Sequence, residues 1–216
     1  MNSLATLSVW ESDVLGVRVG TISPDKVPPV DAIRSENRGL FDVVFVSCPK
    51  WVEQRSGRVA IDYLYDMEMS VSEELTKAAP ASRLVYPGVK LIEVVRSSVI
   101  ESRFLRDPKL LMKSQDRYIR WLSGHQAYVP EDYPNSAFMV PVDDADGARR
   151  ISLIAVHMIS RGGGIGTRLV MGAFAAEPDK KIWRVRVSAR NRRALRFYET
   201  IGFRVKDVST VFNVWV

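Results

Sequence analysis

The chain has 216 residues, of which 46% are apolar, enough to fill a hydrophobic core and to argue against disorder. A single cysteine, Cys48, excludes a disulfide framework within the chain, and no run approaches the roughly 20 apolar residues of a membrane helix. The net charge of +6 fits an anionic ligand, but the basic residues are spread out and form no compact nucleic-acid-binding motif. Without a secretion signal at the start, we expect a cytoplasmic protein with neither a membrane nor a nucleic-acid partner.

The first third of the chain has the pattern of a small α/β unit. Apolar runs, alternation and turn residues predict two strands within Leu7 to Ile22, a helix from Val30 to Arg38, and strands at Phe41 to Val46 and Arg58 to Met69. The best candidate for a linker is Lys77 to Pro87, which contains Ala79-Pro80-Ala81-Ser82. We therefore predict a small α/β N-terminal domain over residues 1–85 and a second domain over residues 86–216.

The second part begins with helical patterns and continues with short strands. Apolar spacing predicts helices from Lys90 to Phe104 and from about Lys109 to Leu122, and a strand at Ala137 to Val142. The acidic run Asp143 to Gly147 resembles part of a calcium loop, but it lacks a ligand two residues before Asp144 and a closing Glu. A solvated hairpin turn is the better interpretation.

A glycine-rich stretch is the most informative segment of the sequence. Ile151 to Val156 has the composition of a buried strand, Ser160 to Gly166 contains four glycines, and Thr167 to Ala176 has helical spacing. Glycines allow unusual backbone angles and a close approach to main-chain N–H groups. Because the unpaired N–H groups of a helix start favour anions, this segment predicts a phosphate or pyrophosphate site.

Two common phosphate loops do not fit this stretch. A P-loop requires Gly-Lys-Ser/Thr, which is missing, and a dinucleotide-binding loop requires G-x-G-x-x-G near the first strand of the fold. The spacing present is R-x-x-G-x-G, formed by Arg161, Gly164 and Gly166.

Another strand and helix follow the glycine loop. The predicted strand Ile182 to Ser188 has one polar face, because Arg184, Arg186 and Ser188 alternate with valines. Asn191 is a reasonable N-cap for a helix from Arg192 to Ile201, and Gly202 stands where a left-handed C-terminal residue usually lies. The segment Val211 to Val216 predicts a final strand.

Two motifs resemble those of the GCN5-related N-acetyltransferases (GNAT superfamily). The first is Arg161-x-x-Gly164-x-Gly166, and the second is Asn191-x-x-Ala194-x-x-Phe197-Tyr198-x-x-x-Gly202-Phe203, in the expected order and separated by one strand. The resemblance implies an α/β (α+β) GNAT fold with a mixed central sheet, and acetyl-CoA as co-substrate.

Other parts of the sequence resemble the TDP-fucosamine acetyltransferases. This resemblance is carried by Trp10-Glu11-Ser12, Gly16, Ser102-Arg103-Phe104, Tyr118 and Trp121, together with the two motifs. Such enzymes acetylate the amine of a nucleotide-linked (dTDP) deoxyamino sugar, and an incomplete α/β GNAT-like N-terminal domain precedes their acetyltransferase domain. The resemblance therefore implies a small-molecule acceptor, a dTDP-amino sugar, and it is compatible with a homodimer.

The resemblance also implies roles for individual residues. Tyr198 would be the general acid that protonates the departing thiolate. Arg103 would hold the nucleotide diphosphate and Tyr118 would line the acceptor pocket. Asn191 would contact the pantetheine arm, cap its helix, or both. The residues expected to bind the cofactor are Val156, His157, Met158, Arg161, Gly162, Gly163, Gly164, Ile165, Gly166, Thr167, Asn191, Ala194 and Phe197.

Several alternatives stay open at this point. The acceptor could be a protein N-terminus or another small amine, and the coenzyme A site could belong to a non-catalytic module. His157 is a candidate base, although a structural role is the simpler interpretation. The only other histidine in the sequence is His125, so the sequence predicts no metal site. Residues 126–149 are short and rich in proline for two full central strands, so the acceptor side could be remodelled.

Overall fold

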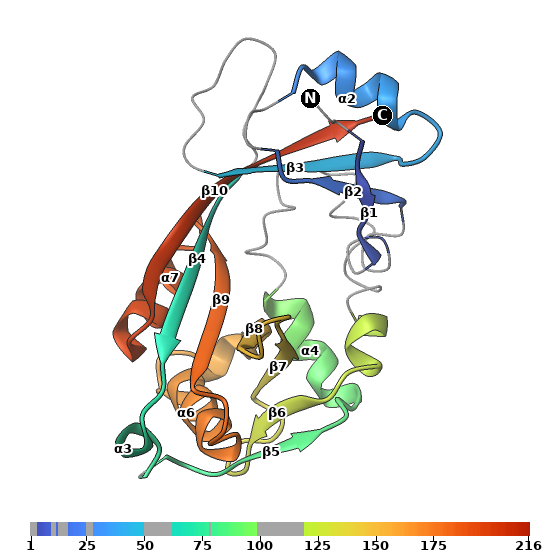
Figure 1. The fold of residues 1–216 in the computed structure, drawn as a ribbon. Helices are drawn as coiled ribbons and strands as arrows, with labels where there is room; N and C mark the ends of the chain where they lie inside the picture. Colours follow the sequence, from blue (N-terminus) through green and yellow to red (C-terminus); the bar gives the residue numbers. More distant parts are fainter. Residues whose placement is uncertain are drawn as a thin grey trace.

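One mixed sheet runs through the whole molecule (Figure 1). In the computed structural model, the described residues are 4–9, 12, 17–24, 28–49, 62–77, 79–98 and 119–216. Within them, ten strands follow the order β1-β2-β3-β10-β4-β9-β8-β7-β6-β5. The strands are β1 (Thr6–Leu7), β2 (Val19–Ile22), β3 (Val43–Pro49), β4 (Asp62–Ser70), β5 (Ser82–Val85), β6 (Ala127–Pro130), β7 (Ala137–Asp143), β8 (Arg149–Val156), β9 (Ile182–Ser188) and β10 (Arg204–Trp215). The helices are α2 (Val30–Asn37), α3 (Glu73–Thr76), α4 (Val89–Ser98), the short 3₁₀ helix η3 (Met158–Ser160), α6 (Ile165–Ala176) and α7 (Arg192–Ile201).

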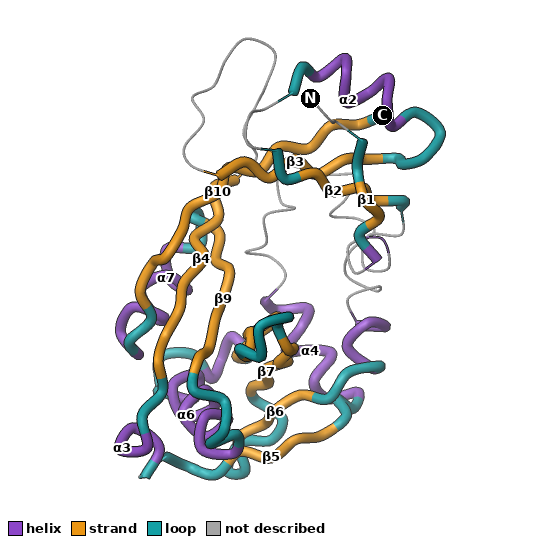
Figure 2. The backbone as a smooth tube through the Cα atoms, in the orientation of Figure 1, coloured by secondary structure: helices purple, strands orange, loops and turns teal. Residues whose placement is uncertain are grey.

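Strand β10 joins the two ends of the sheet. Its first part, from Arg204 to Val211, pairs with β4, and its second part, from Ser209 to Trp215, pairs with β3. Figure 2 shows this strand passing from the lower to the upper half of the view. β4 lies between β10 and β9 and is antiparallel to both. The sheet is therefore continuous across residue 85, and the division into domains at that position stays a prediction.

Most of the elements predicted after residue 136 are confirmed, including the turn between β7 and β8. In that turn the Asp144 N–H donates to the Ala148 carbonyl, and Gly147 has a left-handed φ of 83°. The predicted pairing of strands near Thr6 and Ile22 and the helix α2 are also present. Local patterns and turn residues were sufficient for these elements, because each of them is defined by short-range signals.

Three predictions of element bounds are wrong. The predicted linker contains the strand β5, which pairs with β6 at the edge of the sheet. β3 continues to Pro49, and β10 begins at Arg204, before the predicted Val211.

The predicted helix before Leu122 is described only from residue 119, where residues 119–123 are helical. Arg103 and Tyr118, the predicted acceptor residues, lie outside the described part of the chain, as do Trp10, Glu11 and Gly16.

The helices cover both faces of the sheet (Figure 1). α6 and α7 pack on one face, where Leu169, Phe174 and Ile201 join Trp183 and Val185 in a buried cluster. α4 packs on the opposite face, where its apolar residues meet Phe138, Val140 and Ala155. None of the described helices is long and apolar enough to cross a membrane.

Gly172 marks the closest approach of α6 to the segment that leads into β5. A Cβ added at Gly172 would lie 2.5 Å from the Pro80 carbonyl oxygen and would also clash with Ser82 Oγ. Backbone cannot yield easily, so Gly172→Ala is expected to destabilise the protein by about 1–3 kcal/mol. Thermal unfolding measures this effect. The matched control is Gly88→Ala, where no atom lies within 4 Å of the added Cβ; equal melting temperatures for the two variants would contradict the prediction.

Candidate functional site

The centre of the sheet opens between β8 and β9. The two strands pair in parallel only where Arg149 to Ile151 meets Trp183 to Val185. Beyond these pairs, β8 continues to Val156 and β9 to Ser188 without pairing to each other. The two strands therefore separate beyond Ile151 and Val185. This separation leaves main-chain groups of β8 available to a ligand that lies between the strands.

A β-bulge explains where the separation begins. In the pairing of β7 with β8, Val140 faces Leu153 and Pro141 faces Ile151, so Ser152 is an extra residue on β8. An extra residue bends its strand and increases the local twist. The bulge follows directly after Ile151, the last residue of β8 that pairs with β9. It therefore turns the second half of β8 away from β9.

The glycine loop joins the end of β8 to the start of α6. Gly162 and Gly164 have φ values of 86° and 76°, in the left-handed region that favours glycine. Gly164 is the N-cap residue of α6 and has no side chain that could accept from the first N–H groups. The N–H groups of Ile165, Gly166 and Thr167 therefore lack intrahelical partners. Together with the helix dipole, they form a site for an anion.

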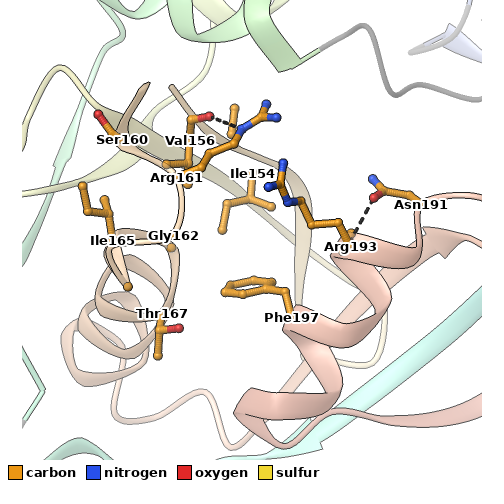
Figure 3. Close-up of a pocket in the computed structure, with 14 residues that line it drawn as sticks. Ile154, Val156, Ser160, Arg161, Gly162, Ile165, Thr167, Asn191, Arg193 and Phe197 are labelled. Atoms are coloured by element: carbon orange, nitrogen blue, oxygen red, sulfur yellow. Dashed lines mark hydrogen bonds between the residues drawn. The ribbon is translucent and has the colours of Figure 1, made fainter. Parts of the chain in front are cut away.

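A cavity of about 350 Å³ lies between the open half of β8, the glycine loop and α7 (Figure 3). Most of the predicted cofactor-binding residues line this cavity, while His157, Met158 and Gly163 do not. The predicted residues in its wall are Val156, Arg161, Gly162, Gly164, Ile165, Gly166, Thr167, Asn191, Ala194 and Phe197. The sequence analysis missed Ile154, Ala155, Ser160 and Arg193, which also line it.

Two arginines give the cavity a positive charge. Arg161 Nε donates to the Val156 carbonyl oxygen at 3.0 Å, which holds this side chain beside the end of β8. Figure 3 shows the guanidinium groups of Arg161 and Arg193 on the same side of the cavity. No carboxylate is present among the described residues that line it. The cavity wall therefore combines two cations with a helix N-terminus, as an anionic ligand requires.

Asn191 and Gly166 fix the position of α7 beside the loop. Asn191 Oδ1 accepts from the Ala194 N–H at 3.0 Å, so the predicted N-cap is confirmed, and the residue also stands in the cavity wall. A Cβ added at Gly166 would lie 3.2 Å from Phe197 Cε2 and 3.5 Å from Val156 Cγ2. Only glycine allows the loop, β8 and α7 to approach one another so closely without displacing Phe197.

Tyr198 lies behind the cavity wall. Its side chain is 2% exposed and makes edge contacts with the rings of Phe197 and Phe203. Burial raises the pKa of the Tyr198 hydroxyl above its usual range. Among the described residues the hydroxyl has no hydrogen-bond partner, and Tyr198 is not part of the cavity lining. The phenol therefore stays protonated at neutral pH.

His157 has a local structural role. Its Nδ1 accepts from the Ile159 N–H at 3.4 Å and caps η3, the short helix before the glycine loop. Within the described residues, no group of three His, Cys, Asp or Glu side chains is arranged to hold a metal ion.

The geometry defines a class of ligand. An extended arm can lie between the open strands, where it meets unpaired backbone, while a diphosphate occupies the N-terminus of α6 beside two arginines. Coenzyme A has this combination of a peptide-like arm and a pyrophosphate. The cavity therefore fits coenzyme A as a ligand.

Comparison with known proteins agrees with this class. Residues 126–205 match the family of the Acetyltransferase (GNAT) domain, so this part of the chain carries a GNAT domain. The two predicted motifs lie within these residues. GNAT domains use acetyl-CoA, and the domain indicates acetyl-CoA-dependent acetyl transfer. No curated protein matches the chain.

Solved structures confirm the GNAT fold. A GNAT-family protein from Novosphingobium aromaticivorans has a TM-score of 0.57 and 18% identity, with 95% of each chain covered. A tandem GNAT protein from the clavulanic acid biosynthesis pathway has a TM-score of 0.53 and 15% identity, with 86% of this chain and 67% of that chain covered. A functionally unknown conserved protein from Staphylococcus epidermidis reaches a TM-score of 0.66 at 11% identity, with 100% and 93% covered.

Proposed function

We propose that the protein transfers an acetyl group from acetyl-CoA to the amine of a dTDP-linked deoxyamino sugar. The observation that carries the donor half of this proposal is that the strand separation, the glycine loop and α7 surround one cavity. The acceptor half rests on the similarity of the sequence to the nucleotide-sugar acetyltransferases. The proposal includes Arg103 as a residue that holds the nucleotide diphosphate and Tyr118 as a residue that lines the acceptor pocket.

The residues of the cavity have separate tasks in this reaction. The N–H groups of Ile165, Gly166 and Thr167 hold the pyrophosphate, with Arg161 and Arg193 adding positive charge. The open half of β8 binds the pantetheine arm through its backbone. Phe197 and Ala194 form the wall of the cavity on the side of α7. The thioester is thereby held between the strands, where an amine can approach it.

The chemical step is a direct attack. The neutral amine nitrogen forms a bond to the thioester carbonyl carbon, and the C–S bond breaks as the oxyanion collapses. The thiolate takes a proton from the Tyr198 hydroxyl, and the proton that the amine releases through water restores the hydroxyl. This role is supported by the position of Tyr198 in the second motif, one helical turn after Ala194, which lines the cavity.

Thiol release from acetyl-CoA tests the proposal. Adding a dTDP-linked deoxyamino sugar is expected to release free coenzyme A and to yield an acetylated sugar nucleotide by mass spectrometry. The matched control is a dTDP-deoxysugar with a hydroxyl in place of the amine, which releases no thiol. Acetylation of a peptide N-terminus or another small amine, without acetylation of any dTDP-amino sugar, would replace the proposed acceptor. Coenzyme A binding without turnover on any amine would identify a non-catalytic module.

A further inference from the structure

The polar face of β9 carries two arginines whose surroundings differ. Val185 and Val187 point into the cluster beneath α6 and α7, so Arg184 and Arg186 stand on the opposite face of the sheet. The alternation predicted from the sequence is therefore confirmed, but the coenzyme A cavity uses neither arginine.

Arg184 is saturated by acidic partners. Its Nε donates to Glu68 Oε2 at 3.0 Å, and its Nη1 donates to Asp144 Oδ2 at 3.2 Å. Asp146 accepts from both Nη1 and Nη2, at 2.9 and 2.7 Å. All three guanidinium nitrogens are used within the sheet and the β7–β8 turn. Arg184 therefore has a structural role in fixing that turn against β4 and β9.

Arg186 has donor capacity left. Its Nε and Nη2 donate to the two oxygens of Asp66 at 2.7 and 3.0 Å, a bidentate pair that fixes the plane of the guanidinium. Among the described residues Nη1 has no partner, and 48% of the side chain is exposed, against 26% for Arg184. Asp66 is held in turn by Arg150, whose Nη1 lies 3.8 Å from Asp66 Oδ1. The Arg186 guanidinium is therefore fixed in orientation, and its Nη1 can donate to a ligand.

Arg186 also stands beside the point where β8 and β9 separate. It follows Val185, the last residue of β9 that pairs with β8, so it occupies the first row beyond the point where the strands separate. The cavity for the donor is lined by the glycine loop and α7, which belong to the face covered by α6 and α7. An acceptor that attacks a thioester between the strands must approach from the opposite face, where Arg186 is exposed.

We infer that Arg186 binds the diphosphate of the acceptor and that Asp66 is the positioning residue for its guanidinium. The inference rests on the proposed function, because it takes the acceptor to be a sugar nucleotide. A guanidinium fork recognises phosphate oxygens with direction as well as charge, and here one edge is fixed by Asp66 while Nη1 stays available. In a sugar nucleotide the ring separates the amine from the diphosphate, so anchoring the diphosphate at Arg186 presents the amine to the thioester.

Titration of dTDP into the protein saturated with coenzyme A tests this inference. Coenzyme A fills the donor site first, because its own phosphates would otherwise compete. Isothermal titration calorimetry is expected to show dTDP binding that weakens at least about tenfold in Arg186→Gln. Arg186→Lys keeps the charge but loses the fork, and it is expected to bind with intermediate affinity. Asp66→Asn weakens binding less than Arg186→Gln, because the guanidinium is retained.

The matched control is Arg184→Gln, which removes the same charge from the same face of the same strand. It is expected to lower the melting temperature and to leave the Kd for dTDP of the folded protein unchanged. Coenzyme A affinity, measured for every variant, verifies that each one is folded. Absence of dTDP binding to the wild type, equal binding by the wild type and Arg186→Gln, or equal weakening in Arg184→Gln would overturn the inference.

The outcome separates this inference from the proposed function. If Arg186→Gln acetylates a dTDP-amino sugar as well as the wild type does, the inference is wrong and the proposed function stands. Conversely, dTDP binding that depends on Arg186, without acetylation of any dTDP-amino sugar, supports the anion site and removes the proposed acceptor reaction.

Discussion

Replacing Tyr198 with phenylalanine is expected to lower turnover at least about tenfold, or about 1.4 kcal/mol of transition-state stabilisation, with acetyl-CoA affinity nearly unchanged. The ring stays in place, because Tyr198 packs between Phe197 and Phe203, which contact its edges. Only the hydroxyl, which is the proposed proton donor for the thiolate, is removed. Steady-state kinetics at saturating acceptor give the turnover, and calorimetry of acetyl-CoA binding gives the affinity.

The pH dependence belongs to the same experiment. Burial raises the pKa of Tyr198 above its ordinary value of 10.0, so the acid form persists as the pH rises to that value. Loss of rate from deprotonation of this acid is therefore expected only above pH 10.

Tyr128→Phe is the control for the substitution at Tyr198. It removes a hydroxyl that donates to Glu177 at 2.9 Å, and Tyr128 belongs to the same buried cluster but does not line the cavity. Normal turnover by Tyr198→Phe would exclude Tyr198 as the acid.

Gly166→Val is expected to weaken acetyl-CoA binding about a hundredfold, equivalent to about 2.8 kcal/mol. The added Cβ would already lie 3.2 Å from Phe197 Cε2, and the two further methyl groups must displace Phe197 or enter the cavity. Either result separates the ligand from the N–H groups at the start of α6. Calorimetry of acetyl-CoA binding measures the change, with thermal unfolding as the test of folding.

The control for this glycine comes from the same loop. Gly163 does not line the cavity, and the nearest atom to an added Cβ there is the Ser160 carbonyl oxygen at 4.0 Å. Gly163→Val is therefore expected to change acetyl-CoA affinity little. Wild-type affinity in Gly166→Val would rule out the glycine loop as the pyrophosphate site.

Local signals were sufficient for the donor side of the fold. The glycine loop, the Asn191 cap and the Gly202 C-cap depend on a few neighbouring residues, and each one is present at its predicted position. By contrast, β5 is a short edge strand in a segment with turn residues, and its partner β6 is distant in the sequence. A pairing between distant segments leaves no periodic trace, so the segment had the appearance of a linker.

The same reason limits what could be predicted of the site. The bulge at Ser152 is defined by the register of β7 against β8, which no residue pattern encodes. Arg193 lies outside the spacing of Asn191, Ala194 and Phe197, and only its long side chain brings it to the cavity. The alternation of Arg184 and Arg186 was visible, but their different partners come from β4 and the β7–β8 turn.

The position of β4 governs the order in which the molecule can assemble. β4 ends at Ser70, while the strands on either side of it begin only at Ile182 and Arg204. During synthesis β4 cannot pair with either neighbour until β9 and β10 have been made, so the centre of the sheet forms late. Folding through such distant contacts is slow. The cavity for coenzyme A is likewise completed late in synthesis, because its wall includes residues of α7, which follows β9 in the chain.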